Sequence, residues 1–198
     1  MDLTAEHVLS RGRVRASLFQ DDVRDSIYAQ TNITVTPNIT NVQNVGRVRT
    51  RGIETAFTLD RFIIDTMSLE GSIAYAQSKI LENDNYPISV GNEWPRIPDW
   101  RGYLQALWRP NVDLLASLAV RYSGRTYNRL ENDDSHGDVY GGVSKFTFVD
   151  ARVAYTFSNA LELALGVDKL LNDHAYQVHP YPGRTGLLEV RWSFQDRP

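Results

Sequence analysis

The sequence predicts an all-β protein in which about nine antiparallel strands follow one another as an up-and-down meander. First, apolar and polar residues alternate along most of the chain, which is the period of a β-strand. Second, the segments between these strands are alternately short and long. Third, apolar residues at helical spacing are scarce. Together, these observations indicate a meander whose two ends differ in loop length.

In chain order, the first four strands are predicted near residues 1–9, 13–30, 41–59 and 66–80. The third shows the alternation clearly, with one face formed by Ile53, Thr55, Phe57 and Leu59 and the other by Glu54, Ala56 and Thr58. The fourth repeats the pattern, with Met67, Leu69, Ile73 and Tyr75 opposite Ser68, Glu70 and Ser72. Each of these segments therefore has one apolar face and one polar face.

The remaining strands are predicted near residues 98–109, 112–124, 146–157, 161–172 and 186–194. The eighth is the most regular, with Leu161, Leu163, Leu165 and Val167 on one face and Glu162, Ala164, Gly166 and Asp168 on the other. The last strand alternates in the same way through Leu188, Val190, Trp192 and Phe194. The same two-faced character therefore continues to the end of the chain.

The connections carry the strongest structural signal. Short connections are predicted at 10–12, 60–65, 110–111 and 158–160, and long ones at 31–40, 81–97, 125–145 and 173–185. In a meander every second turn lies at the same end, so one end has tight turns and the other has long loops. Outer-membrane barrels have this asymmetry, whereas a soluble Greek-key sandwich has no reason to keep it.

Composition excludes several classes of protein. The 198 residues contain 21 Lys and Arg against 24 Asp and Glu, so the net charge is −3 and bulk charge does not favour nucleic acid as a partner. The chain has no Cys, which excludes a disulfide-stapled ectodomain, a zinc finger and thiol catalysis. No phosphate-binding glycine motif or nucleophile–base pattern occurs, so we expect neither an enzyme nor a cofactor nor a resident metal.

Aromatic residues suggest which face meets lipid. Trp100 and Trp108 share one parity and lie eight residues apart, a contour of about 26 Å at the usual strand rise. With strand tilt, this span fits the apolar band between the two aromatic girdles of a membrane barrel. We therefore predict an aromatic girdle that comprises Trp100, Trp108, Trp192 and Phe194. Alternation alone is also compatible with a soluble sandwich whose polar face is solvated.

Nine strands are an odd number, and an open sheet would leave two unpaired edges that hydrocarbon does not tolerate. The chain is therefore expected to be part of a larger barrel. Four segments resemble, in order, the barrel of TonB-dependent outer-membrane receptors. They are Phe19–Ile27, Asn44–Glu54, Gly166–Asp173 with Tyr176, and Pro182–Arg184 before the strand that ends at Phe194.

The resemblance implies a 22-stranded barrel, an N-terminal plug and a TonB-contacting box, in a receptor that imports a scarce nutrient. On this basis residues 1–198 are the C-terminal barrel segment, without the plug and the earlier strands. The implied partners are outer-membrane lipid and lipopolysaccharide, a small nutrient ligand such as a ferric siderophore or other metal chelate, and the TonB complex through the missing N-terminal region. The implied location is the Gram-negative outer membrane. Lys169 stands where the family usually has Asn, and the chain continues past Phe194.

Two groups of residues are candidate sites. Aromatic and histidine residues of the predicted long loops are candidates for ligand binding: Trp94, Tyr127, His136, Tyr140, His174 and His179. Arg47, Arg49 and Arg51 share the parity of Ile53, so we expect them to face outward at the long-loop end, near lipopolysaccharide phosphates. A solvated or cross-strand-paired ladder, or a bulge that reverses parity, would explain them without lipid.

Two other functions remain open at this point. One is a passive structural or adhesin-type outer-membrane barrel, which would not be energised. The other is a soluble β-sandwich that binds carbohydrate through Trp94, Tyr127 and Tyr140. The two membrane functions place the apolar faces against lipid, whereas the sandwich buries them in a core.

Overall fold

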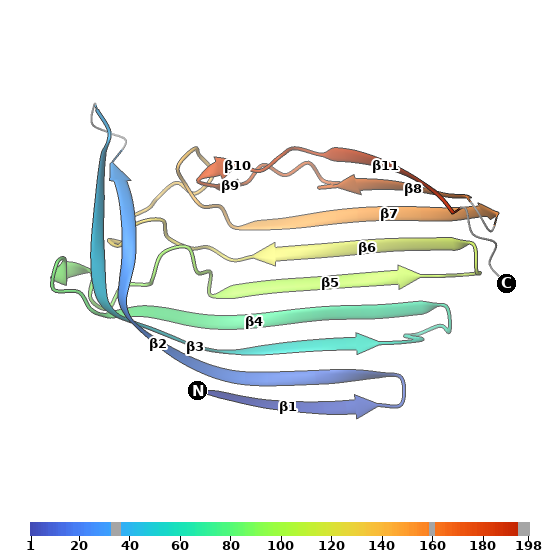
Figure 1. The fold of residues 1–198 in the computed structure, drawn as a ribbon, viewed down its shortest axis with the longest axis horizontal. Helices are drawn as coiled ribbons and strands as arrows, with labels where there is room; N and C mark the ends of the chain where they lie inside the picture. The colour runs from blue at the N-terminus through green and yellow to red at the C-terminus, as the bar shows by residue number, and fades with distance from the viewer. Residues whose placement is uncertain (33–36, 159–160, 194–198) are drawn as a thin grey trace.

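The computed structural model describes residues 1–32, 37–158 and 161–193 and shows one open antiparallel sheet (Figure 1). Nine strands lie in the order β1-β2-β3-β4-β5-β6-β7-β8-β11. Their bounds are β1 (Asp2–Leu9), β2 (Gly12–Asn32), β3 (Ile39–Leu59), β4 (Met67–Glu82), β5 (Trp100–Trp108), β6 (Leu114–Ser123), β7 (Phe146–Ser158), β8 (Leu161–Asp168) and β11 (Thr185–Trp192). Each strand pairs with its neighbour in sequence, apart from the step from β8 to β11.

The predicted meander and its alternation of short and long connections are confirmed. Three small elements were not predicted: the 3-10 helix η1 (Pro87–Ser89), and β9 (Tyr176–Gln177) with β10 (His179–Pro180), which form a two-stranded sheet. Elements of two or three residues are too short to show a period. Nowhere in the described part of the chain is there a helix with the length and apolar character needed to cross a membrane.

The outer face of the large sheet is apolar and open. Large side chains at its centre keep between 43 and 53% of their surface exposed, namely Leu18, Ile53, Ile73, Leu104, Leu118 and Leu165. No second layer covers these side chains in the described ranges, so the carbohydrate-binding sandwich, which would bury them, does not fit this fold.

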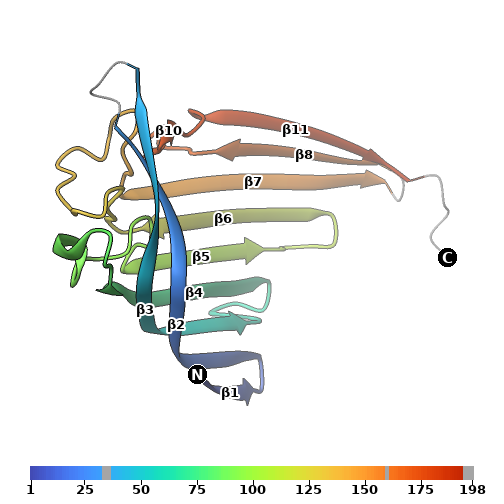
Figure 2. The same ribbon diagram turned by 60° about the vertical axis from the view of Figure 1, so that its left-hand side comes forward.

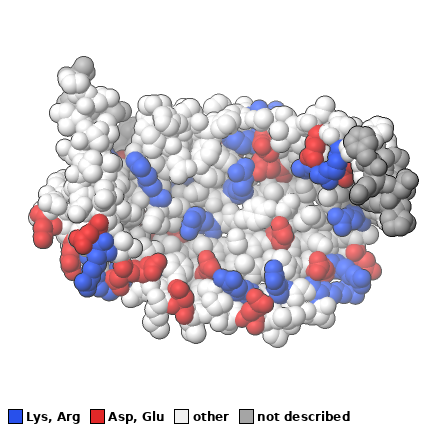
Figure 3. Space-filling model, in the orientation of Figure 1, with Lys and Arg blue, Asp and Glu red and all other residues white. Residues whose placement is uncertain are grey.

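The inner face carries charges of both signs, which are interspersed over the sheet in Figure 3. Cross-strand ion pairs connect Arg15 with Glu54 at 3.6 Å and Arg121 with Asp150 at 2.8 Å. Arg191 pairs with Glu162 at 3.4 Å farther along the sheet. The polarity of the sheet is thus inverted relative to a soluble protein, as in a membrane barrel with a wet interior.

A cluster of buried apolar residues lies at the long-loop end instead of between two layers. Their apolar cluster consists of Tyr28, Val45, Val48, Ile80 and Leu130, with Tyr86 and Trp94 packed against it. Leu130 comes from the connection between β6 and β7, whereas the other four fully buried members come from β2, β3 and β4. The cluster therefore anchors a long loop onto the ends of three strands.

Two irregularities bend the distal part of the β2–β3 hairpin. Asp25 has a φ of 53° and is left out of the pairing between β2 and β3, and the pairing of β3 with β4 shifts register between Arg47 and Val48. The shift between β3 and β4 is a β-bulge, in which Leu81 is the extra residue, and a bulge increases local twist and redirects a strand. At Asp25 and Gly46 the pairing of β2 with β3 is interrupted without a change of register. As a result, the hairpin turns across the long-loop end of the sheet, as both ribbon views show (Figures 1 and 2).

Candidate ligand-binding and lipid-facing sites

The hairpin and the loop after β6 are joined by hydrogen bonds between residues distant in sequence. The Tyr28 hydroxyl donates to the carbonyl of Asn128 at 2.6 Å. Gln30 Nε2 donates to Glu131 Oε2 at 3.0 Å, and the backbone N–H of Leu130 donates to Gln30 Oε1 at 3.3 Å. These bonds satisfy polar groups around the buried cluster and fix the loop against the hairpin.

The loop after β4 is tied to the same segment. Asn92 Nδ2 donates to the carbonyl of Leu130 at 2.8 Å. Asn132 and Glu93 bond reciprocally, because the Glu93 N–H donates to Asn132 Oδ1 at 2.7 Å and Asn132 Nδ2 donates to the Glu93 carbonyl at 3.1 Å. Three segments thus form one cap, which we define as residues 26–32, 83–99 and 124–145.

The pKa values of two carboxyl groups in the cap are shifted in opposite directions. Burial raises the pKa of Glu93 above its usual value, and the charge of Asp99 adds to this effect. Burial also opposes ionisation of Glu131, but the hydrogen bond from Gln30 and the charge of Arg129 outweigh it, so the pKa of Glu131 is lowered. Glu131 therefore stays ionised as an acceptor within the cap.

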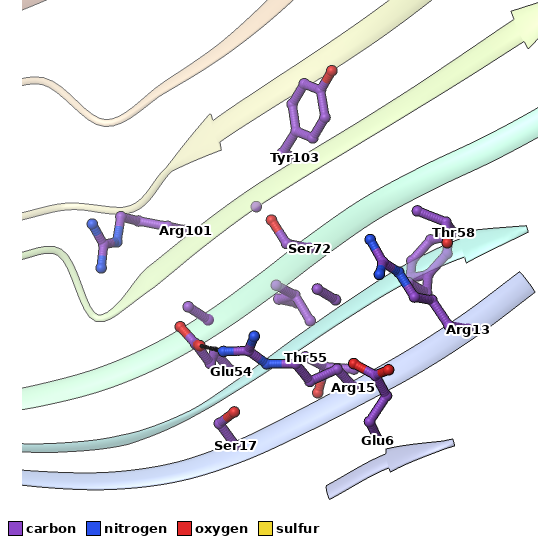
Figure 4. Close-up of a pocket in the computed structure, with 15 residues that line it drawn as sticks. Glu6, Arg13, Arg15, Ser17, Glu54, Thr55, Thr58, Ser72, Arg101 and Tyr103 are labelled. Carbon is purple, nitrogen blue, oxygen red and sulfur yellow. Dashed lines mark ion pairs between the residues drawn. The ribbon is translucent and has the colours of Figure 1, made fainter. Parts of the chain in front are cut away.

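Two hollows lie on the inner face of the sheet. The larger has a volume of about 580 Å³ and is lined in part by Glu6, Arg13, Arg15 and Glu54; Figure 4 shows the Arg15–Glu54 ion pair within it. The second, of about 400 Å³, lies where β5 and β6 meet the long loops and includes Arg96 and Arg121. Arg101, Gly102 and Tyr103 line both hollows, so the two are adjacent.

Contacts join two of the six predicted ligand-binding residues. Tyr140 and His179 pack edge to face with ring centroids 5.3 Å apart, although they come from different loops. Backbone hydrogen bonds from Gly141 to Val178 and from Val178 to Gly142 hold these loops together. The pair is exposed, so a ligand could reach it from the long-loop end.

The other four predicted residues are dispersed. Trp94 packs on Tyr28 at 5.4 Å, which makes it part of the cap interior. Tyr127 lies under the guanidinium of Arg125 at 5.0 Å. His136 is exposed and bonds to the hydroxyl of Ser135, and His174 is exposed. In the described residues, no three His, Asp or Glu side chains gather in a way that could hold a metal ion.

The three predicted arginines lie on the outer face beyond the aromatic residues. Arg47 and Arg49 share Asp22, with nitrogen–oxygen distances of 3.0 and 3.1 Å, and Arg51 donates to Gln77 at 3.0 Å. They form the cross-strand-paired ladder that the sequence left open. The register adds Arg24 opposite Arg47 and Lys79 opposite Arg49. We call Arg24, Arg47, Arg49, Arg51 and Lys79 the basic patch.

The basic patch lies next to the predicted aromatic girdle. Trp100 contacts Tyr75 at 4.9 Å, and Tyr75 pairs with Ile53, one step along the outer face from the Arg51–Gln77 pair. Trp108 and Trp192 are exposed on the same face toward the short-turn end. Phe194 lies outside the described residues. The outer face therefore runs from aromatic residues through an apolar band to aromatic residues and then to cations.

The alternation of residues predicts that Arg121 faces the lumen, but it does not predict the second hollow or the other residues that line it. Arg96 precedes β5 and Arg101 lies at its start, whereas Arg121 comes from β6, and no local motif joins the three. The only available signal was that Arg101 and Arg121 share the polar parity at the long-loop ends of two adjacent predicted strands.

An open meander with an apolar outer face, a charged inner face and long loops at one end is the wall of a transmembrane β-barrel. The sequence matches the family described as TonB dependent receptor-like, beta-barrel over residues 2–170. The chain therefore belongs to this family of transport receptors.

Solved structures with the same fold include three uptake proteins. The chain is similar to the ferric citrate transporter FecA (TM-score 0.78, 23% identity, 96% of this chain and 30% of that one). It is also similar to the siderophore receptor PiuA from Acinetobacter baumannii (TM-score 0.73, 19% identity, 96% of this chain and 28% of that one). A third is the ferric yersiniabactin uptake receptor FyuA from Yersinia pestis (TM-score 0.76, 16% identity, 98% of this chain and 29% of that one). The chain spans about three tenths of these proteins. No curated protein matches the sequence.

Proposed function

We propose that residues 1–198 form the C-terminal barrel segment of a receptor for energised uptake of a small nutrient, such as a ferric siderophore or another metal chelate. The receptor would lie in the Gram-negative outer membrane and contact the TonB complex through an N-terminal region outside this chain. The observation that carries the proposal is the family match over residues 2–170. The inverted polarity of the sheet and the functions of FecA, PiuA and FyuA support it.

Uptake of radioactive iron tests this proposal. Cells that produce the intact protein are supplied with a panel of ferric chelates, with a tonB deletion strain and a strain lacking the protein as controls. We expect uptake of at least one chelate that requires both the protein and TonB. Uptake that persists without TonB would favour the passive barrel, and the absence of uptake for every chelate would contradict the receptor function.

We propose, as a second role, that the basic patch contacts phosphate groups of lipopolysaccharide. Its five cations are accompanied by three carboxylates, namely Asp22 and Glu82 in ion pairs and Glu93 opposite Lys79, and therefore retain an excess of positive charge. Its position beyond the Tyr75–Trp100 pair is where headgroups meet a barrel wall. Arginine suits this role because its planar donors bind phosphate oxygens in pairs.

The triple replacement Arg47→Gln, Arg49→Gln and Arg51→Gln tests this contact in the intact protein. We expect less lipopolysaccharide to co-purify with this variant than with the wild type. The control is Arg152→Gln with Arg191→Gln, which removes cations from the inner face. Equal retention in the triple variant and the wild type would contradict the contact.

A further inference from the structure

The second hollow is lined by basic and aromatic side chains, and we call it the arginine hollow. Arg96, Arg101 and Arg121 line it, and its lining in the described part of the chain contains no Asp or Glu. On the rest of the inner face, by contrast, arginines are mixed with carboxylates, as in the Arg15–Glu54 and Arg191–Glu162 pairs. The arginine hollow is therefore a local excess of positive charge.

Two of its three guanidinium groups are not neutralised by a carboxylate. Arg101 makes no side-chain hydrogen bond or ion pair with any residue that the structure describes. Arg96 donates from Nε to the neutral amide of Asn128 at 2.7 Å. Arg121 alone is paired, with Asp150 at 2.8 Å. Arg101 and Arg96 therefore have donors available for a ligand that brings its own negative charge.

Aromatic contacts hold the wall of the arginine hollow in place. Phe146 and Phe148 are stacked at 4.2 Å, and Tyr181 meets both rings edge to face at 5.5 and 5.4 Å. The Tyr181 hydroxyl donates to Gln177 at 2.6 Å, and the N–H of Tyr176 donates to the buried Ser144 at 2.8 Å. A wall fixed in this way keeps the orientation of its polar groups, which lowers the entropic cost of binding.

The location and size of the arginine hollow suit a small solute. It lies at the inner face where β5 begins and β6 ends, beneath residues of the long loops such as Thr126 and Val143. Its volume of about 400 Å³ is in the range of small-molecule sites. A carboxylate fits the fork of a guanidinium by two parallel hydrogen bonds, and a second arginine favours a ligand with more than one anionic group.

We propose that the arginine hollow binds a compact polyanion with several carboxylates, such as a carboxylate chelate of ferric iron. The proposal rests on the uptake function proposed above and assigns it a substrate class. Arg101 is the main anchor because it has no partner among the described residues. Arg96 is a second contact, and the aromatic wall excludes water on one side. A neutral chelate of similar size would leave both guanidinium groups without a counter-charge.

Equilibrium binding to the intact purified protein tests the proposal with two probes, anionic ferric citrate and a neutral ferric trihydroxamate. We expect the wild type to prefer ferric citrate, and Arg101→Gln to weaken that binding about tenfold or more. Arg101→Lys keeps the charge but loses the paired geometry, so its affinity for ferric citrate should lie between those of the wild type and Arg101→Gln. Arg13→Gln is the matched control, because Arg13 is an inner-face arginine that lines only the other hollow.

The outcomes separate this proposal from the receptor function. Wild-type binding of ferric citrate that Arg101→Gln leaves unchanged would overturn the arginine hollow as its site. Binding of the neutral chelate alone, or of neither probe, would overturn the substrate class. TonB-dependent uptake of any other chelate would leave the receptor function intact in each of these cases, because that assay does not depend on the arginine hollow.

Discussion

Tyr28 and Asn128 lie 100 residues apart in sequence, yet the Tyr28 hydroxyl donates to the Asn128 carbonyl at 2.6 Å. This bond joins the bent end of the β2–β3 hairpin to the loop between β6 and β7. Asn128 in turn donates from Nδ2 to the carbonyl of Gly141 at 2.7 Å and accepts from Arg96. The contact therefore links the buried cluster to the segment beside the arginine hollow.

Tyr28→Phe should loosen the cap without unfolding the sheet. The ring still packs on Trp94, but the bond to Asn128 is lost and a part-buried carbonyl loses its donor, at a cost of about 1 kcal/mol. We expect residues 124–145 to be cleaved severalfold faster by trypsin, with the barrel otherwise intact. Tyr140→Phe is the control, because Tyr140 is 62% exposed. Equal cleavage of the two variants would contradict this role for Tyr28.

The Gln30–Glu131 hydrogen bond should weaken at low pH, when Glu131 becomes protonated. The pKa of Glu131 is lowered from 4.5 in the folded protein, so its contribution to stability is complete above pH 4.5 and is lost as the pH falls through the lowered value. Since the chain has no cysteine, a spin label on Ser135→Cys can report motion of the loop. We expect the label to become more mobile only below pH 4.5. In Glu131→Gln this acid-dependent step should be absent, and its persistence would assign the step to another group.

Lys169 should be a stabilising residue although it departs from the family's usual Asn. It directly follows β8 and has a φ of 53°, a left-handed conformation that Asn adopts more readily than Lys. Its buried side chain has two contacts that Asn is too short to make: Nζ donates to the Pro182 carbonyl at 2.8 Å and lies 4.6 Å from the centre of the Phe148 ring.

Lys169→Met removes both contacts and should lower the unfolding free energy by about 1–2 kcal/mol. We expect the folded, fast-migrating form of the intact barrel to convert to the unfolded form at a lower temperature on semi-native gels. Lys145→Met is the matched control, because Lys145 is an exposed lysine in the loop before β7. The conversion temperature of Lys169→Asn should lie between those of the wild type and Lys169→Met, because the better backbone preference of Asn offsets part of the stability lost with the two contacts. Identical melting of the two methionine variants would show that the contacts of Lys169 contribute nothing.

Sequence periodicity was sufficient to predict the strands because each has one apolar and one polar face over most of its length. It also placed Arg49 and Arg51 on the outer face, since they lie on the straight part of β3. It could not predict the bend, because neither the left-handed backbone of Asp25 nor the bulge at Leu81 changes the alternation of apolar and polar residues in a recognisable way. The cap depends on that bend and on loop contacts across about 100 residues, as in Gln30–Glu131. The arginine hollow depends on contacts between separate long loops, and no local pattern encodes either feature.

Close approach between strands explains why residue 52 is a glycine in the segment Asn44–Glu54, which resembles the receptor family. A Cβ at this position would lie 2.1 Å from the Tyr75 carbonyl oxygen and 2.7 Å from Cζ of Phe19, which pairs with Gly52 across β2 and β3. The oxygen belongs to the backbone of β4 and cannot move without displacing the strand. Gly52→Ala should therefore cost about 2–4 kcal/mol and reduce the yield of folded, heat-modifiable barrel. Gly102→Ala is the control, because its nearest neighbour would be an ordinary contact at 3.8 Å. If both variants assembled as well as the wild type, close approach between β3 and β4 would not be the reason for glycine at this position.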